Sequence, residues 1–300
     1  MKVTVLYGGP SAEREVSLVS GKAVAAGLRQ AGHDVFEFDI QPDDLSGLDR
    51  PCDVVFPVLH GAWGESGELQ EILEQRRLPF VGSGSTASRL GMDKVLTKRA
   101  WETAGLPTPP YRLVTSSEGD LPDEPCVVKA IDGGTSIDVI VIKDPAGPVR
   151  VAEAVETIIS RHGRALVETF ISGPELTVGL LEEKPLAPIR IVPKRGFFDF
   201  EAKYRAADTE HRFDTGLPDE LIARCQELAR QANEIVGARD LARIDVMIDE
   251  RTQQPYLLEI NTLPGFTPKS LLPEAAAHAG IPFEQLVDRL VRRAHARQTG

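Results

Sequence analysis

The sequence lacks the features that define several classes of protein. It has three cysteines in 300 residues, Cys52, Cys126 and Cys225, which are far apart and odd in number. This spacing fits neither a disulfide framework nor a zinc site with closely spaced ligands, so it indicates a reducing cytoplasm. The chain also opens without a basic region followed by a long apolar run, and we expect neither a signal peptide nor a membrane span.

An excess of positive charge is missing as well. The formal net charge is −11, which disfavours a nucleic-acid partner because phosphate backbones demand a concentrated basic surface. A small anionic ligand is not excluded, since a few lysines in one cleft can hold phosphates on an acidic protein. The basic stretch from Arg289 to Arg297 lies on an expected helix, and we interpret it as a solvated helix face rather than a binding patch.

Two glycine signatures of nucleotide-binding proteins are absent. Gly8 to Ser11 form a turn between a strand and a helix, but without the three spaced glycines of a dinucleotide site. Asp132 to Ser136 form a loop rich in backbone donors and hydroxyls that does not match the Walker pattern. This loop follows Lys129. It either wraps a polyphosphate or belongs to a surface hairpin from which the Lys129 ammonium reaches solvent.

Short apolar runs and helical segments alternate through residues 1–92. This pattern predicts a three-layer α/β domain, and 42% hydrophobic residues supply an adequate core. We place domain boundaries after residues 92 and 173. Residues 93–173 then form a central α+β subdomain, and residues 174–300 form a C-terminal subdomain. The expected strands are 2–7, 35–40, 53–58, 126–130, 139–143, 165–171, 176–181, 189–193, 244–248 and 256–260. The expected helices are 13–31, 68–76, 93–104, 149–161, 219–236 and 282–296.

Two of these strands carry polar side chains that we expect to meet. Side chains alternate faces along a strand, so Arg243 and Asp245 share one face and Glu259 and Asn261 share one face of the next strand. A turn with Asp249 opposite the proline at 255 places Asp245 across from Glu259, and Leu258 then points to the other face. Facing carboxylates repel, and Mg²⁺ would relieve this repulsion through oxygen ligands. The alternative is a solvent-exposed polar face on which Arg243 bridges the acids.

Other polar residues have weaker signals. His60 follows an expected strand at the carboxyl end of the sheet, where open α/β sheets bind ligands. A histidine at this position is also often a structural hydrogen-bonding residue. The polar segment 197–216 is long for a connection and is typical of a lid.

Seven segments, taken together, resemble the D-alanine:D-alanine ligase family. They occur in the order in which the family has them and extend over nearly the whole chain. They are GGPSAEREVS at 8–17, LHGAWGESGELQ at 59–70, MDK at 92–94, SGPE at 172–175, EAKY at 201–204, RIDVM at 243–247 and EINTLPGFTPKSLLP at 259–273. The resemblance implies an ATP-grasp fold with an N-terminal α/β domain, a lid-like central subdomain, a C-terminal catalytic subdomain and a homodimer.

The resemblance also implies roles for individual residues. Magnesium is expected on Asp245, Glu259 and Asn261, as two ions that Mn²⁺ can replace. ATP is expected to contact Lys94, Lys129 and Lys203 through its phosphates and Glu168, Phe170, Ile171 and Glu175 through adenine and ribose. Glu13 and His60 are expected to bind the first D-amino acid, and Ser270 and Leu271 to border the second. Arg243 and the Gly265 backbone N–H are expected to stabilise an oxyanion, while Thr135 is expected to hydrogen-bond with Glu13 and Tyr204.

The implied reaction forms an acyl phosphate between ATP and the first D-alanine carboxylate, which the amine of the second D-alanine then attacks. The chain departs from the family around its central loop. Thr135 stands where serine is usual and Asp138 where glycine is usual, which adds negative charge near the expected phosphates. His211 and Arg212 occupy a lid region that is often more aromatic, and Lys269 stands where histidine is common.

Three alternatives follow from these departures and from the motifs. The second substrate can be D-lactate, D-serine or another amino acid, although Tyr204 favours an amine nucleophile. The chain can be a nucleotide-binding homologue without turnover, but binding alone would not require Arg243, Asp245, Glu259 and Asn261 together. A dinucleotide oxidoreductase is disfavoured because the glycine fingerprint is absent.

Overall fold

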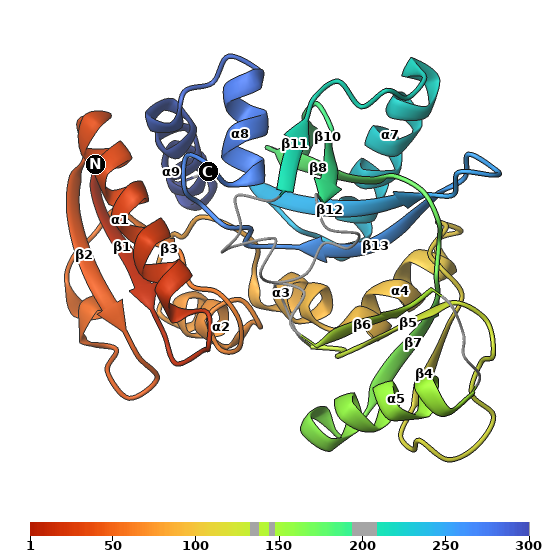
Figure 1. The fold of residues 1–300 in the computed structure, drawn as a ribbon. Coiled ribbons are helices and arrows are strands. Elements are labelled where there is room, and N and C mark those ends of the chain that lie inside the picture. Colours follow the sequence, from red (N-terminus) through yellow and green to blue (C-terminus); the bar gives the residue numbers. More distant parts are fainter. Residues whose placement is uncertain (133–137, 144–147, 194–208, 300) are drawn as a thin grey trace.

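A computed structural model describes residues 1–132, 138–143, 148–193 and 209–299. The elements fall into three sheets with their covering helices (Figure 1). Thr135, Lys203 and Tyr204, for which the sequence predicts roles, lie outside the described residues. Within the described ranges, no helix has the length and apolar character needed to cross a membrane.

The N-terminal sheet is parallel, in the order β2-β1-β3. Alternate residues of its central strand face opposite layers, since Val5 packs in one apolar cluster and Leu6 in another. The first cluster includes residues of α1 and the second includes residues of α2. This arrangement confirms the expected three-layer α/β architecture. The elements are β1 (Lys2–Gly8), α1 (Arg14–Gln30), β2 (Asp34–Ile40), η1 (Ser46–Asp49), β3 (Val54–Pro57) and α2 (Glu68–Gln75).

The central sheet is antiparallel, in the order β4-β7-β5-β6. Helix α5 covers one of its faces, where Val128 and Val167 pack with Val151 and Val155. Asp93 begins α4 by accepting hydrogen bonds from Val95 N and Leu96 N at 2.9 Å. The elements are α3 (Ser85–Met92), α4 (Lys94–Thr103), β4 (Tyr111–Val114), β5 (Cys126–Lys129), β6 (Val139–Ile142), α5 (Pro148–His162) and β7 (Ala165–Thr169).

The C-terminal sheet has the order β11-β10-β8-β12-β13, with β9 paired to β8. Helix α7 packs on one face, where Cys225 and Ala229 meet Ile244 and Leu257 in a buried cluster. The elements are β8 (Glu175–Leu181), β9 (Lys184–Pro185), β10 (Ile189–Pro193), β11 (Thr209–Arg212), α7 (Asp219–Val236), β12 (Leu241–Ile248), β13 (Pro255–Asn261), α8 (Leu271–His278) and α9 (Phe283–Thr299).

The last helix returns to the beginning of the chain. Leu286 and Leu290 of α9 are fully buried and share a cluster with Val24 and Leu28 of α1. In Figure 1, α9 (dark blue) accordingly lies between the N-terminal unit, which comprises β1 to α2, and the C-terminal sheet.

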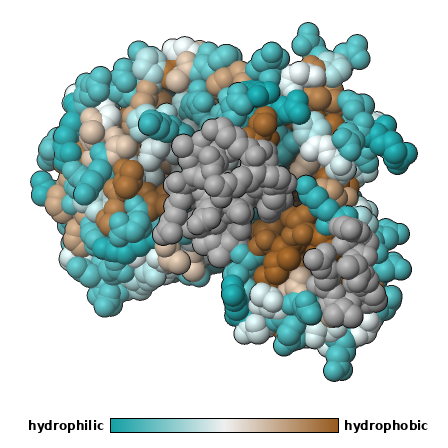
Figure 2. Space-filling view, in the orientation of Figure 1, coloured by the Kyte–Doolittle hydropathy of each residue, from teal (hydrophilic) through white to brown (hydrophobic). Residues whose placement is uncertain are grey.

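Figure 2 shows the same face as a surface. Hydrophobic residues (brown) are visible between the central unit, which is built on the β4-β7-β5-β6 sheet at lower right, and the C-terminal sheet above it.

Six of the described elements were not predicted from the sequence, namely η1, α3, β4, β9, β11 and α8. Helix α3 has only eight residues, and its buried side chains are the small Ser85, Ala87 and Ser88, so hydrophobic periodicity is weak. Strand β4 is an edge strand with exposed Arg112 and Leu113. Short or edge elements bury too few apolar side chains to leave a clear pattern in the sequence.

Candidate active site

The hairpin of β12 and β13 brings the predicted polar residues together. Asp245 pairs with Glu259 and Arg243 pairs with Asn261, as expected from the alternation of side chains. Arg243 and Asp245 are buried, with 5% and 6% of their surfaces exposed. The alternative of a solvent-exposed polar face is therefore wrong for these two residues.

The predicted register at the turn is wrong by one residue. Ile248, and not Asp249, pairs with Pro255, and the ladder shifts between Asp245 and Val246. A bulge of this kind places two residues of one strand against one of the other. Leu257 is consequently the buried core residue and Leu258 is only half-buried, contrary to the predicted alternation. Beyond the bulge, Asp245 pairs with Glu259, as the sequence predicted.

Arg243 and Asp245 form a bidentate ion pair within one strand. Arg243 Nε donates to Asp245 Oδ1 at 2.9 Å, and Arg243 Nη2 donates to Oδ2 at 2.8 Å. Thr177 on the neighbouring β8 donates its hydroxyl to Asp245 Oδ1 at 2.6 Å. Two charged groups buried together require such pairing, because each alone would be strongly destabilising. The three contacts fix the orientation of the Asp245 carboxylate.

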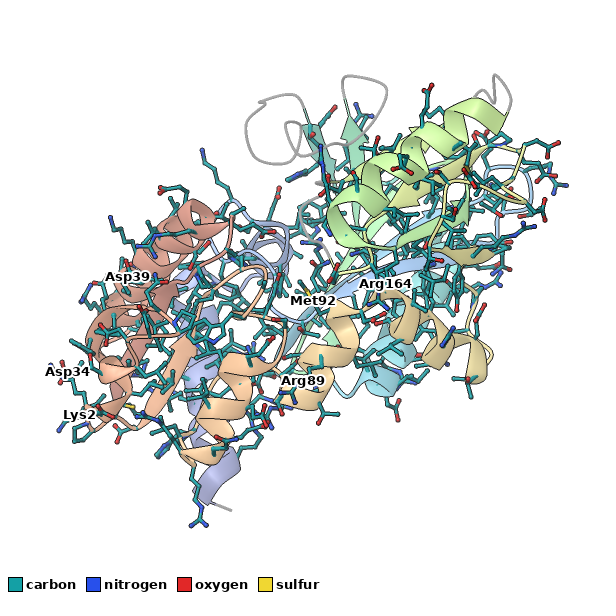
Figure 3. All side chains as sticks on the ribbon, turned by 90° about the horizontal axis from the view of Figure 1, so that it is seen from below. Lys2, Asp34, Asp39, Arg89, Met92 and Arg164 are labelled. Atoms are coloured by element: carbon teal, nitrogen blue, oxygen red, sulfur yellow. The ribbon has the colours of Figure 1, made fainter. Side chains whose placement is uncertain are left out.

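A small cleft lies beside this pair where the units meet. It is lined by Glu65, Met92, Lys94, Glu259 and Asn261, among others. Lys94 Nζ lies 3.4 Å from Glu259 Oε2. In the view from below, Met92 lies between the N-terminal unit and the central unit, which carries Arg164 (Figure 3).

The hairpin residues are suitable ligands for a hard divalent cation. Asp245 and Glu259 contribute carboxylate oxygens on adjacent strands, and Asn261 contributes an amide. The Asn261 Nδ2 atom is buried without a hydrogen-bond partner among the described residues. The amide oxygen and nitrogen can exchange places, so a cation would satisfy this group through its oxygen. Within the described part of the chain, no three His, Cys, Asp or Glu side chains cluster as metal ligands.

Glu168 joins two lysines in the interior of the central unit. Its Oε1 lies 2.7 Å from Lys98 Nζ and its Oε2 lies 2.7 Å from Lys129 Nζ. Burial alone would raise the pKa of Glu168, but Lys129 and Lys98 outweigh this effect and hold it below its ordinary value. Burial lowers the pKa of Lys98 to about 8. Lys129 is only 7% exposed, so the alternative of a solvent-reaching lysine is wrong.

Lys98 was not identified in the sequence. Its side chain is fully buried, and its ammonium also donates to the hydroxyl of Thr108, which donates to the Leu257 carbonyl at 2.9 Å. The central unit is thereby bonded to β13 of the hairpin. Lys98 follows Lys94 by four residues, so the two lysines lie on neighbouring turns of α4. This spacing was the sequence feature from which Lys98 could have been identified.

The N-terminal unit contributes two adjacent loops at the carboxyl ends of its strands. Ser11 Oγ donates to the His60 carbonyl at 2.5 Å. Gly61 has a φ of +74°, and a Cβ there would lie 2.9 Å from Ser11 Cβ, so only glycine permits this close approach. Glu13 precedes the first residue of α1 and lies next to Gly61. The two loops therefore bring Glu13 near His60.

His60 is buried and uncharged at neutral pH. Burial lowers its pKa to about 4, more than the hydrogen bond with the Leu263 backbone raises it, and Arg243 lowers it further. Its Nε2 has no hydrogen-bond partner among the described residues. A neutral imidazole with one unsatisfied nitrogen can donate to or accept from a ligand.

Glu65 is a second carboxylate that sequence reasoning missed. Its Oε1 accepts from Gly61 N at 2.9 Å. Burial raises the pKa of Glu65 to about 8, and the neighbouring charge of Glu13 raises it further, while Lys94 and Arg243 oppose the shift. Two adjacent carboxyl groups are favourable where a cation binds between them. Glu65 lies within the motif at 59–70, and this position was the only signal.

The residues expected around adenine lie at the end of β7 and the start of β8. Lys143 Nζ lies 5.5 Å from the ring centroid of Phe170. Ile171 is half-buried in the connection between the strands, and Glu175 begins β8. Phe170 and Ile171 lie in the connection that leads to Glu175, whereas Glu168 is bonded to the two lysines. Their contact with a nucleotide stays a prediction.

The loop after β13 carries the remaining predicted residues. Ser270 Oγ accepts from Thr267 N at 3.0 Å, and Ser270 and Leu271 lie at the beginning of α8. Gly265 is close to this hydroxyl, since a Cβ on Gly265 would lie 3.3 Å from Ser270 Oγ. Gly265, Ser270 and Leu271 are therefore brought together, although their contacts with a substrate stay predictions. Lys269 is exposed.

The unusual Asp138 does not leave an uncompensated charge. It has a φ of +59°, a region in which glycine and, less readily, aspartate are found. Its carboxylate accepts from Arg161 at 2.5 Å and bonds His162 Nε2 at 2.8 Å. Burial would raise the pKa of Asp138, but these partners hold it below its ordinary value. The carboxylate of Asp138 therefore pairs with the last two residues of α5.

Comparison with known proteins matches the N-terminal and the C-terminal parts of the chain to one family. The model described as "D-ala D-ala ligase C-terminus" matches residues 100–292, and the one described as "D-ala D-ala ligase N-terminus" matches residues 41–83. The chain belongs to the D-alanine:D-alanine ligase family. It therefore has the ATP-grasp fold, as the sequence predicted.

Similar proteins extend over the full length of the chain. A D-alanine--D-alanine ligase from Gloeobacter violaceus is 43% identical and covers 98% of this chain and 99% of its own. One from Marinobacter nauticus is 45% identical, covering 97% of this chain and 90% of its own. The crystal structure of the ligase from Bacillus anthracis has a TM-score of 0.88 at 31% identity, covering 100% and 99%. A structure of that ligase complexed with ATP has a TM-score of 0.84.

Proposed function

We propose that this chain is an ATP-dependent ligase that joins two D-alanines to D-alanyl-D-alanine in the cytoplasm, for peptidoglycan precursor synthesis. The observation that carries the proposal is the hairpin, in which Asp245 and Glu259 face each other beside Lys94 and Arg243. Its support comes from relatives with this name that match the whole chain. Because these relatives are named for D-alanine, the alternatives with another second substrate or without turnover are not favoured.

ATP is the phosphoryl donor in this proposal. The ATP complex of a similar ligase supports it. Lys94, Lys129 and Lys203 offset the charge of the phosphates, and Glu168 holds Lys129 in place. Adenine and ribose lie against Phe170, Ile171 and Glu175. A negatively charged protein can bind ATP where a few lysines lie in one cleft.

Asp245, Glu259 and Asn261 hold magnesium in this proposal. Two ions bound there, or Mn²⁺ in their place, would stabilise the charge on the transferring phosphoryl group. The chain itself prepares the ligands, since Thr177 and Arg243 orient Asp245 and Lys94 approaches Glu259.

The first D-alanine binds through its ammonium group to Glu13, with Glu65 and His60 beside it. Its carboxylate oxygen attacks the γ-phosphorus, the bond to the β-phosphate oxygen breaks and ADP leaves, which gives an acyl phosphate. The expected partners of Glu13, Thr135 and through it Tyr204, lie outside the described residues. Exclusion of water from the site would protect the acyl phosphate from hydrolysis.

The second D-alanine lies against Ser270 and Leu271. Its amine attacks the acyl carbon, the carbon–oxygen bond to phosphate breaks, phosphate leaves and the amine loses a proton. Arg243 and the Gly265 N–H donate to the oxyanion, and the loss of one such donor typically costs about 3 kcal/mol. Arg243 is suited to this role because its pair with Asp245 fixes the guanidinium.

ADP release in the presence of ATP, Mg²⁺ and a panel of D-amino and D-hydroxy acids tests the proposal, with products identified by mass. We expect turnover with D-alanine alone and a product of its dimeric mass. If D-alanine gave no ADP release but another pair of substrates did, the substrate assignment would be overturned. The proposal includes a homodimer, which the mass in solution would test.

A further inference from the structure

The C-terminal helix α9 connects two units that each contribute part of the proposed site. Helix α9 packs on α1, where a Cβ on Gly27 would lie 3.1 Å from Phe283 and 3.3 Å from Val287. Asp288 Oδ1 bonds His33 Nε2, a buried histidine before β2, at 2.7 Å. The helix is thereby attached to the unit that carries Glu13 and His60.

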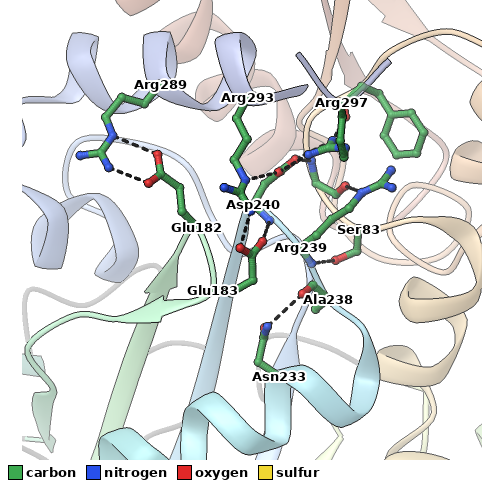
Figure 4. Close-up of polar contacts among 12 residues, drawn as sticks. Ser83, Glu182, Glu183, Asn233, Ala238, Arg239, Asp240, Arg289, Arg293 and Arg297 are labelled. Carbon is green, nitrogen blue, oxygen red and sulfur yellow. Dashed lines mark hydrogen bonds and ion pairs between the residues drawn. The ribbon is translucent and has the colours of Figure 1, made fainter. Parts of the chain in front are cut away.

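Three arginines of α9 bind acids of the C-terminal unit (Figure 4). Arg289, Arg293 and Arg297 are spaced four residues apart, so they share one edge of the helix. Arg289 donates to Glu182 at 2.8 and 3.1 Å, and Arg293 donates to Glu183 and, at 3.2 Å, to Asp240. We call these three the arginine row. These arginines remain partly exposed, with 42%, 39% and 31% of their side-chain surfaces accessible, so the interpretation as a solvated face is incomplete rather than wrong.

Asp240 is the centre of the contacts. It is 0% exposed and directly precedes β12. Arg297 forms two bonds with it, one of them 2.9 Å long, and Gly82 N donates to its Oδ2 at 2.8 Å. Arg297 also donates to the Phe80 carbonyl at 2.9 Å. One carboxylate thus joins the C-terminal helix, the segment at Phe80 and Gly82, and the start of β12.

The two glutamates occupy backbone positions that disfavour them. Glu182 and Glu183 form the two-residue turn between β8 and β9 with φ values of +52° and +61°, and Asp240 has a φ of +66°. Asn-Gly is the favoured pair in such a turn. Glutamate is sterically disfavoured at positive φ, so its presence is compensated by the bonds to the arginine row.

Both segments held by Asp240 lead into the site. Val81 N bonds the Val55 carbonyl at 3.0 Å, and β3 continues from Val55 toward His60. Strand β12 begins at the residue after Asp240 and carries Arg243 and Asp245. A rotation of one unit about Asp240 would change the separation of His60 and Arg243.

We infer that Asp240 is a positioning residue, which the arginine row holds so that the binding loops for the first substrate face Arg243. This inference rests on the proposed function. It does not involve the sheet of the central unit, to whose strand β5 the phosphate lysine Lys129 belongs. Loss of the contact is therefore expected to affect D-alanine and ATP differently.

Asp240→Asn tests the inference, because asparagine also tolerates positive φ and keeps the side-chain shape. We expect kcat/KM for D-alanine to fall about tenfold, since a displacement of about 1 Å can reduce rates up to about a hundredfold. KM for ATP should stay within about twofold. Glu234→Gln, which removes an exposed partner of Arg230, is the matched control and should leave both values unchanged.

Arg297→Gln is a second variant at the end of the last helix and should show the same split, with partial recovery in Arg297→Lys. Amide hydrogen exchange of residues 81–83 in the ligand-free chain should be faster in Asp240→Asn than in the control. Unchanged kcat/KM for D-alanine, or equal changes for D-alanine and ATP, would overturn the inference. So would unchanged exchange, whereas a wild-type chain inactive with D-alanine would contradict the proposed function instead.

Discussion

Asp245 lies directly opposite Glu259, although the strand ladder slips by one residue immediately beside this pair. If the pairing next to the turn, in which Ile248 faces Pro255, continued along the whole hairpin, Asp245 would lie opposite the apolar residue 258. The bulge therefore has a chemical consequence, because it sets two carboxylates side by side where an unshifted ladder would separate them.

Glu259→Gln tests the proposed magnesium ligands. Glutamine keeps the shape but loses the charge, and we expect kcat to fall by roughly a hundredfold or more, since metal stabilisation of phosphoryl transfer contributes several kcal/mol. ADP release would be measured as a function of Mg²⁺ concentration. Glu220→Gln, at the exposed start of α7, is the control and should keep the wild-type rate. A near-normal rate in Glu259→Gln would refute the metal assignment.

Thr177→Val tests the orientation of Asp245. Valine has nearly the same shape but cannot donate to the buried carboxylate oxygen, so we expect a loss of about 1 to 3 kcal/mol in the free energy of unfolding. Urea denaturation would measure it, together with a fall in kcat. Thr157→Val, on an exposed turn of α5, is the control. Equal stability of the two variants would show that the Thr177 hydroxyl does not hold Asp245.

Glu65→Gln should change the dependence of stability on pH. The pKa of Glu65 is raised from 4.5 to about 8. Between these values the folded chain keeps a proton that the unfolded chain has released, so the wild type loses stability as the pH rises through this window. Glutamine cannot ionise, and the Tm of the variant relative to wild type should therefore increase from pH 5 to pH 8. A constant Tm difference would contradict the raised pKa.

Lys98→Met should destabilise the central unit. It leaves Glu168 with one lysine in a buried position, and removal of one partner from a buried ion pair typically costs about 3 to 5 kcal/mol. The double variant with Glu168→Gln should recover part of this loss, because no unpaired carboxylate then remains. Chemical denaturation of the single and double variants would measure the coupling. Additive losses would show that the Lys98 and Glu168 charges do not interact.

The sequence predicted much of the site because alternation along strands places polar residues reliably on one face. Arg243, Asp245 and Glu259 were found in this way. It could not show the bulge, since one inserted residue has no signature in a half-buried apolar strand such as β13. The main elements followed from periodicity, whereas α3 was missed because its buried residues are small.

Long-range charge pairing was the other part that could not be predicted. Lys98 and Glu168 are 70 residues apart in the numbering, yet they form one buried pair. Arg297 and Asp240 likewise meet only through the packing of α9. A charge along a helix looks the same in the sequence whether it faces solvent or a distant carboxylate.

Transfer of oxygen from substrate to phosphate tests the central claim most directly. D-alanine labelled with ¹⁸O in its carboxyl group would be supplied with ATP and Mg²⁺, and the released phosphate would be analysed by mass. A reaction through an acyl phosphate transfers one labelled oxygen to phosphate for each dipeptide formed, because the carbon–oxygen bond breaks when the amine attacks. Formation of D-alanyl-D-alanine with unlabelled phosphate would contradict the account.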